Sequence, residues 1–132
     1  MTASVSVAFS SAATIDRINI LQASLGAMAR ALAGLPVNAD FALIDGRDIP
    51  AGLAPEARAV IGGDGKCLSI AAASIVAKVM RDRLMKRCAL TYPDFGFDRH
   101  KGYGTKTHRA AIAEHGACPL HRLSFAPLRI DK

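Results

Sequence analysis

A short apolar run that ends on an acid is the feature that most constrains this chain of 132 residues. Residues 41–44 read Phe-Ala-Leu-Ile, and Asp45 and Gly46 follow directly. Continuous apolar runs of this length are typical of strands that are covered on both faces of a sheet. A carboxylate at the end of a buried strand is costly unless a metal, a cation or hydrogen bonds compensate its charge. The run therefore predicts a covered sheet with a charged group at its carboxyl edge, where open α/β sheets place their sites.

A second acid, Asp64, lies in a glycine-rich loop, Gly62-Gly63-Asp64-Gly65, just before a segment of small residues. The glycines allow close approach of the backbone to a ligand, and the start of a helix favours anions nearby. Asp45 and Asp64 together predict a divalent-metal site. Two-metal hydrolysis of a phosphodiester needs several carboxylates around ions roughly 4 Å apart, so two acids are too few. The alternative that both are ordinary turn residues stays open.

Strand and helix patterns alternate along the chain and predict the α/β class. Alternating apolar residues at 5, 7 and 9 predict a half-buried strand. A helix capped by Thr14, with Asp16 in its first turn, should follow and end at Gly34 and Pro36. A strand over residues 58–61 and a long helix over about residues 68–89 come next. Residues 92–104 read as a loop, a helix of about ten residues ends at His115, and an irregular tail follows.

The composition favours one globular domain spanning residues 1–132, without a membrane span or a secretory signal. Three widely spaced cysteines with no CxxC pair predict reduced thiols in a cytoplasmic protein. The formal net charge of +6 fits a polyanionic partner such as nucleic acid. A basic protein with no such partner fits the same charge, and this alternative stays open.

A second group of candidate residues runs from His100 to Thr105, with the sequence HKGYGT. His100 and Lys101 can contact phosphates, and Tyr103 between two glycines can stack on a sugar or a base. The alternative is a surface loop with one buried tyrosine. His121, Arg122 and Ser124 form a further basic cluster, or else a solvated tail. His108 and His115 are spaced poorly for a shared metal, and we expect them to be structural or capping residues.

Several segments taken together resemble bacterial ribonuclease HII, the type 2 ribonuclease H. The resemblance covers essentially residues 5–130. The matching pieces are ID-INILQASLGAMARALAGL from Ile15, FALIDG from Phe41, GGDGK from Gly62, AAASIVAKVMRDR from Ala71, YPDFGFDRHKGYGT from Tyr92 and AEHGACPLHRLSFAP from Ala113. The resemblance implies an RNase H-like fold, a mixed sheet flanked by helices, in a cytoplasmic enzyme. It implies an endonuclease, dependent on Mg²⁺ or Mn²⁺, that cleaves the RNA strand of RNA–DNA hybrids. It also implies cleavage of duplex DNA on the 5′ side of an embedded ribonucleotide, by a monomer.

The resemblance also assigns roles to individual residues. Asp45 resembles the third of the family's four metal-binding carboxylates, and Asp64 resembles the fourth. Tyr103 resembles the tyrosine that packs against the ribonucleotide's sugar and helps to sense its 2′-hydroxyl group. Lys101, His100 and Arg122 are the further candidate substrate contacts. Asp82 matches a family position outside the four, and we expect it to be structural and to pair with Arg81 or Lys78.

The family's first two carboxylates lie in a strand that ends in a DEVGRG motif, and no segment of this chain resembles that motif. The only glutamates are Glu56 and Glu114, and neither follows an aspartate. Gly62 stands where the family has a lysine, and Ala71 where it usually has a serine. The resemblance therefore implies an incomplete fold without its first two strands, with unpaired strand edges and exposed apolar surface.

We expect this chain alone to cleave little or not at all. A non-catalytic nucleic-acid-binding remnant and an unstable fragment are the alternatives. The remnant would bind through Lys101, Tyr103 and the His121-Arg122 pair.

Overall fold

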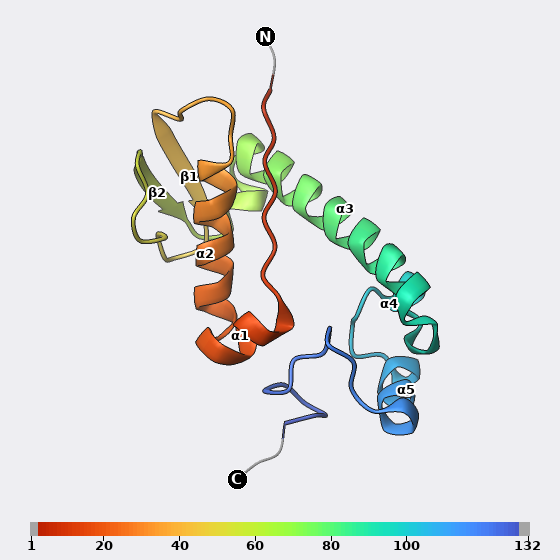
Figure 1. Cartoon of the computed structure of the whole chain (residues 1–132). Helices are drawn as coiled ribbons and strands as arrows, with labels where there is room; N and C mark the ends of the chain where they lie inside the picture. Colours follow the sequence, from red (N-terminus) through yellow and green to blue (C-terminus); the bar gives the residue numbers. More distant parts are fainter. Residues whose placement is uncertain (1–2, 130–132) are drawn as a thin grey trace. The chain divides into compact units, whose positions relative to one another are not determined.

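The computed structural model describes residues 3–129 and contains both helices and strands, in agreement with the predicted α/β class (Figure 1). They are α1 (Ala12–Ile18), α2 (Ile20–Ala33), β1 (Phe41–Asp45), β2 (Glu56–Val60), the 3₁₀ turn η1 (Gly63–Gly65), α3 (Leu68–Thr91), the 3₁₀ turn η2 (Pro93–Phe95), α4 (Phe97–His100) and α5 (Lys106–His115). The chain forms two compact units, which we call unit 1, up to Ala77, and unit 2, from Lys78 onward. The expectation of a single domain stays a prediction.

The sheet of unit 1 consists of β1 and β2, which pair in parallel with Phe41 opposite Glu56 and Asp45 opposite Val60. Ala42 and Ile44 are buried, whereas Phe41 and Leu43 are 48% and 40% exposed. The prediction that β1 is covered on both faces is therefore wrong within the described residues. Successive side chains of a strand point to opposite faces, and the structure covers one of them. Asp45 lies on the exposed face, so its charge is not buried.

The second predicted strand forms, but it spans Glu56–Val60 rather than residues 58–61. The predicted strand over residues 5–9 does not form. This segment runs alongside α2 without joining the sheet (Figure 1). The Arg30 guanidinium donates to the Phe9 carbonyl at 2.7 Å, and the Ser10 hydroxyl donates to the Ala23 carbonyl at 3.1 Å. Alternation predicts a strand only where a neighbouring backbone can complete the ladder, and here side chains and a helix carbonyl take those bonds.

The helical region after it begins earlier than predicted and is divided in two. Ser11, not Thr14, is the N-cap of α1, and its hydroxyl accepts a hydrogen bond from the Thr14 amide at 3.1 Å. Asn19, with φ at +71°, then ends α1 and caps α2 through its side-chain carbonyl. Asparagine tolerates positive φ and bonds the backbone locally, so it can interrupt an apolar stripe that otherwise continues. The predicted end at Gly34 is confirmed, since Gly34 is the C-cap of α2.

Unit 2 has a core of two aromatic and two aliphatic side chains: Met85, Phe95, Phe97 and Ile112. The rings of Phe95 and Phe97 stack with centroids 5.4 Å apart, and Phe97 is only 1% exposed. The predicted long helix is confirmed as α3 and the helix ending at His115 as α5. The segment predicted as a loop contains η2 and α4, because Phe95 and Phe97 pack into the core and draw the backbone into turns. No helix of the described part is long and apolar enough to cross a membrane.

Candidate functional site

Asp45 at the end of β1 is joined to the glycine loop by a hydrogen bond. Its Oδ1 accepts from the Gly63 amide at 2.8 Å. A Cβ atom at position 63 would lie 2.6 Å from the Cδ1 of Ile70 and 3.3 Å from the Asp45 Oδ1, so only glycine fits. The absence of a side chain at Gly63 thus lets the loop approach both the carboxylate and α3.

Asp64 lies in η1 and is exposed. Its Oδ1 accepts from the Gly65 amide at 3.0 Å, which orients the carboxylate locally. The Lys66 ammonium donates to the Ile61 carbonyl at 2.7 Å and ties the two ends of the loop together. Because Gly63 binds Asp45 and directly precedes Asp64, the two acids lie at the same edge of unit 1.

The residues at this edge are of the type that binds a hard divalent cation, but there are too few of them. Carboxylate oxygens are the ligands that Mg²⁺ and Mn²⁺ prefer. Within residues 3–129, however, no group of three or more His, Cys, Asp or Glu side chains is placed to hold a metal ion. As candidate ligands, Asp45 and Asp64 alone would therefore be an incomplete set for such an ion.

The loop around Tyr103 in unit 2 is held through its backbone by side chains from neighbouring helices. The Arg81 guanidinium donates to the Lys101 carbonyl at 3.2 Å, and the Arg109 guanidinium donates twice to the Gly104 carbonyl, at 3.0 and 2.9 Å. Gly102 adopts φ of +85°, which an L residue rarely adopts, and its amide donates to Nδ1 of His100 at 3.1 Å. Sequence reasoning missed Arg81 and Arg109, because no local pattern tells which arginine bonds to a loop carbonyl.

Tyr103 itself is fixed by its backbone while its side chain is 62% exposed. Its amide donates to the His100 carbonyl at 2.9 Å, and its carbonyl accepts from Nδ1 of His108 at 2.9 Å. The alternative of a buried tyrosine is therefore wrong. An exposed aromatic ring on a fixed backbone is suited to stacking on a sugar or a base.

Both ring nitrogens of His100 form hydrogen bonds with backbone atoms in or near this loop. Its Nδ1 accepts from the Gly102 amide, so its Nε2 carries the proton and donates to the Phe95 carbonyl at 2.6 Å. Desolvation by burial lowers the pKa of His100, and the neighbouring His108 adds to this. With both ring nitrogens bonded to the backbone, the predicted phosphate contact of His100 does not fit this arrangement.

His108, which bonds to the Tyr103 carbonyl, also contacts His121 of the irregular tail. Their Nε2 atoms are 2.9 Å apart, and Nδ1 of His121 accepts from the Cys118 amide at 2.9 Å. His108 is 6% exposed, which confirms the structural role predicted for it. Desolvation by burial, followed by repulsion from His108, lowers the pKa of His121. His121 thus ties the irregular tail to α5.

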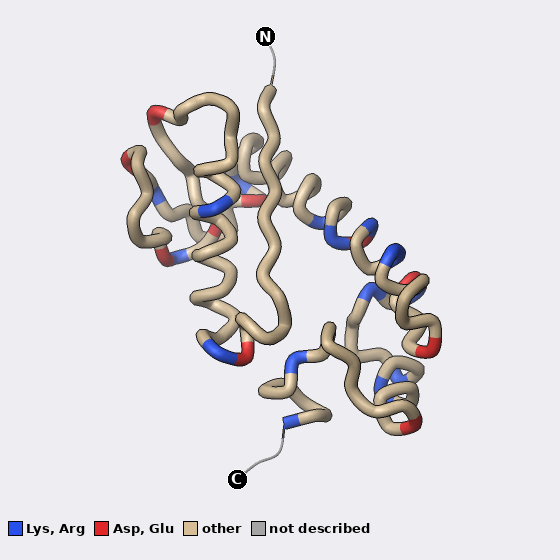
Figure 2. The backbone as a smooth tube through the Cα atoms, viewed as in Figure 1, with Lys and Arg blue, Asp and Glu red and all other residues tan. Residues whose placement is uncertain are grey.

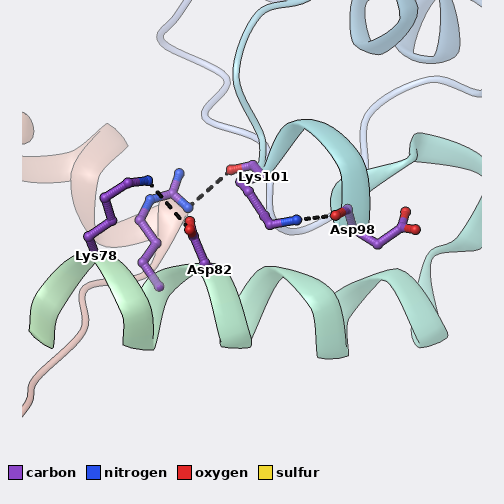
Figure 3. Close-up of polar contacts among 5 residues, drawn as sticks. Lys78, Asp82, Asp98 and Lys101 are labelled. Carbon is purple, nitrogen blue, oxygen red and sulfur yellow. Dashed lines mark hydrogen bonds and ion pairs between the residues drawn. The ribbon is translucent and has the colours of Figure 1, made fainter. Parts of the chain in front are cut away.

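The remaining candidates surround the same part of unit 2. Lys101 directs its ammonium to the Asp98 carbonyl, and Asp82 pairs with Lys78 at 3.4 Å, as predicted (Figure 3). The Arg122 guanidinium lies 4.3 Å from the centroid of the Phe125 ring. Arg81, Arg109 and Arg122 line an open hollow of about 430 Å³ together with His108 and His121. Further basic side chains follow along the second half of α3, namely Arg83, Lys86 and Arg87 (Figure 2).

Residues 2–128 match the family model of ribonuclease HII. The chain belongs to the ribonuclease HII family. The resemblance stated from the sequence is thereby confirmed, and the α/β structure with its pair of parallel strands is a partial RNase H-like fold.

Named relatives agree with this assignment. The ribonuclease HII of Sinorhizobium fredii is 59% identical over 128 residues, which are 97% of this chain and 55% of that protein. That of Sinorhizobium medicae is 57% identical over 97% of this chain and 59% of its own length. That of Agrobacterium fabrum is 55% identical over 98% of this chain and 60% of its own length. By their name these relatives are ribonucleases, and this chain spans a little over half of each.

Proposed function

We propose that this chain is the part of a ribonuclease HII that supplies two of its metal-binding carboxylates and its ribonucleotide-recognition loop. The whole enzyme would cleave the RNA strand of RNA–DNA hybrids. It would also cleave duplex DNA on the 5′ side of an embedded ribonucleotide. The hydrogen bond from the Gly63 amide to Asp45 supports this proposal most directly, because it places the acids of two separate motifs at one edge. A monomeric, cytoplasmic protein is part of the same proposal.

Asp45 and Asp64 would hold Mn²⁺ or Mg²⁺ through their carboxylate oxygens. When bound, such an ion lowers the pKa of water and stabilises the leaving oxygen of a phosphodiester. The chain's own contribution is orientation. The Gly63 amide directs one oxygen of Asp45, and the Gly65 amide directs one oxygen of Asp64. Two carboxylates leave most of a six-fold coordination shell to water or other ligands, so we propose that the chain alone has little or no activity.

Substrate recognition would come from unit 2. The Tyr103 ring is exposed on a backbone that is already fixed, so little ordering entropy is lost when it stacks. Lys101 and Arg122 would contact phosphates, and the basic side chains of α3 would add sequence-independent attraction. The 2′-hydroxyl beside the tyrosine would distinguish a ribonucleotide from a deoxyribonucleotide.

A cleavage assay tests the catalytic part of the proposal. The chain is incubated with Mn²⁺ and a duplex that carries one ribonucleotide, and the products are resolved on a denaturing gel. We expect little or no cleavage, with Asp45→Asn as the matched variant. Robust cleavage that Asp45→Asn abolishes would show that the chain assembles a complete site and would overturn this part.

A second candidate is a nucleic-acid-binding remnant without catalysis, which the preformed loop of unit 2 favours. It would bind hybrid duplexes with an affinity that falls with salt and does not depend on metal. Replacing Lys101 and Arg122 together by alanine should then weaken binding. Unchanged binding by this double variant would count against it.

A further inference from the structure

Three histidine rings of unit 2 form a continuous series beneath the Tyr103 loop. The rings of His100 and His108 stack with centroids 4.3 Å apart and an angle of 16° between their planes. His108 and His121 follow with centroids 5.2 Å apart and a hydrogen bond between their Nε2 atoms. This series joins α4, α5 and the irregular tail, and it bonds to the Gly102 amide and to the Tyr103 carbonyl.

The backbone assigns one proton to each ring. The Gly102 amide donates to Nδ1 of His100, so that ring carries its proton on Nε2. The Tyr103 carbonyl can only accept, so His108 carries its proton on Nδ1 and its Nε2 is an acceptor.

The Cys118 amide donates to Nδ1 of His121, so its Nε2 carries the proton that reaches His108. The three assignments agree with one another only when all three rings are neutral. A second proton on any ring would point at a donor instead of an acceptor.

We propose that His108 and His121, with His100, are positioning residues that set the Tyr103 backbone only in their neutral forms, so that ribonucleotide recognition is lost on acidification. This inference rests on the proposed function for the role of Tyr103. His108 holds the Tyr103 carbonyl, and His121 holds His108 in the tautomer that can donate there. The effect on substrate therefore passes through Tyr103, and none of the three rings needs to touch the nucleic acid.

The charges around the rings favour the neutral forms. Arg81 of α3, Arg109 of α5 and Arg122 of the tail line the same hollow as His108 and His121. Near His100, the charge of Asp98 raises the pKa of the ring and the charge of Arg99 lowers it. Burial lowers the pKa of both His100 and His121. These two rings therefore gain a second proton, and lose the hydrogen bonds of their neutral forms, below the ordinary histidine range near pH 6.5.

Imidazole NMR on the unmodified, ¹⁵N-labelled chain tests the proton assignment directly. At about pH 7.5 we expect protons on Nε2 of His100, Nδ1 of His108 and Nε2 of His121. His115 lies outside the series in the last turn of α5 and serves as the internal reference. A proton on Nε2 of neutral His108, or on Nδ1 of neutral His121, would overturn the proposal.

Tyrosine fluorescence tests the coupling to Tyr103. The chain has no tryptophan and two tyrosines, so Tyr92→Phe leaves Tyr103 as the only emitter. We expect its emission to change with the same midpoint as the NMR titration of His121. His108→Asn keeps an N–H for the Tyr103 carbonyl but cannot ionise, and should remove the change. His115→Gln should leave the change intact. A change that persists in His108→Asn would contradict the coupling.

Binding completes the test and separates this inference from the proposed function. The measured quantity is the ratio of the dissociation constants for an all-DNA duplex and the same duplex with one ribonucleotide. We expect this preference to fall about threefold to tenfold between about pH 7.5 and about pH 5.5, as for the loss of one hydrogen bond. It should not fall in His108→Asn.

The two ideas can fail separately. A wild-type preference that stays constant while His121 titrates would overturn the inference. No preference at any pH, with the tautomers and the fluorescence as expected, would overturn the role of Tyr103 in the proposed function. It would leave the positioning of the Tyr103 backbone established.

Discussion

The two units of this chain differ in how completely they are built around their candidate residues. In unit 1, Asp45 and Asp64 lie at the edge of a two-stranded sheet, and Phe41 and Leu43 are exposed on the same face of β1 as Asp45. Unit 2 has a core with two stacked aromatic rings, and side chains bond to the backbone of its Tyr103 loop at each of residues 101–104. The part proposed to hold metal is thus open and partial, and the part proposed to recognise the substrate is preformed.

Under the proposed function, recognition and catalysis would therefore depend on different units of the same chain. Recognition would need a few side chains fixed by local contacts, such as those that hold the Tyr103 loop within residues 78–129. Metal binding needs ligands from several elements that converge on one point. Among the described residues, β1 and η1 carry the two candidate ligands, Asp45 and Asp64.

The largest expected effect comes from the core of unit 2. Phe97→Ala should lower the free energy of unfolding by about 3–5 kcal/mol, because it removes a fully buried ring and leaves a cavity. Urea unfolding followed by tyrosine fluorescence measures this change. Leu90→Ala, at a side chain that is 85% exposed, is the control and should change the stability by less than about 0.5 kcal/mol. Equal effects of the two variants would mean that unit 2 has no such core.

In unit 1, Gly63→Ala should be more harmful than Gly65→Ala. The added Cβ at position 63 would lie 2.6 Å from Ile70, whereas a Cβ at position 65 meets nothing within 4 Å. Overpacking of this kind costs about 1–3 kcal/mol and should displace Asp45 from its hydrogen bond. Amide hydrogen exchange in β1 and η1 reads the effect. If the two variants exchange alike, the close approach of the loop to Asp45 is not a constraint.

Acid should weaken unit 2 more than unit 1. The pKa values of His100 and His121 are lowered in the fold by burial, so the unfolded chain binds more protons. Their contribution to stability is therefore fully present above about pH 6.5 and is lost as the pH falls towards the folded-state values. Urea unfolding at several pH values should show this slope, and His121→Asn should reduce it. A stability that rises on acidification would contradict the sign.

The smallest expected effect is that of the exposed ion pair on α3. Lys78 and Asp82 lie 3.4 Å apart, with the lysine side chain 65% exposed. Exposed pairs of this spacing contribute about 0.3–0.5 kcal/mol, so Asp82→Asn should change the stability by no more than that. A thermal melt at low and at high salt checks this. A loss above about 2 kcal/mol would show that Asp82 has a role beyond this pair.

Local patterns predicted the elements well where one side chain or one helix face decides the outcome. The strand before Asp45, the long helix α3 and the end of α2 at Gly34 all follow from short-range rules. Prediction failed where a distant partner decides. Alternating residues at 5, 7 and 9 could not become a strand, because the Phe9 carbonyl is bonded to Arg30 of α2.

The residues of the candidate site also fall into those that the sequence identifies and those whose role depends on a distant partner. The acids and the tyrosine can be singled out from the sequence, since a carboxylate directly after an apolar run and an aromatic residue between glycines are local patterns. The roles of His100, Arg81 and Arg109 do not stand out, because each bonds a backbone atom that the sequence cannot place beside it. Three-dimensional contact, not residue type, turns His100 from a candidate phosphate ligand into a support of the loop.

The most direct test of the central claim compares two duplexes that differ by a single 2′-hydroxyl group. Fluorescence anisotropy gives the affinity of the chain for each, with Mn²⁺ and with EDTA, for the wild type and for Tyr103→Ala. We predict that the ribonucleotide duplex is bound more tightly, that EDTA leaves this preference intact, and that Tyr103→Ala removes it. A preference that disappears with EDTA or survives Tyr103→Ala would contradict a preformed recognition unit that works apart from the metal ligands.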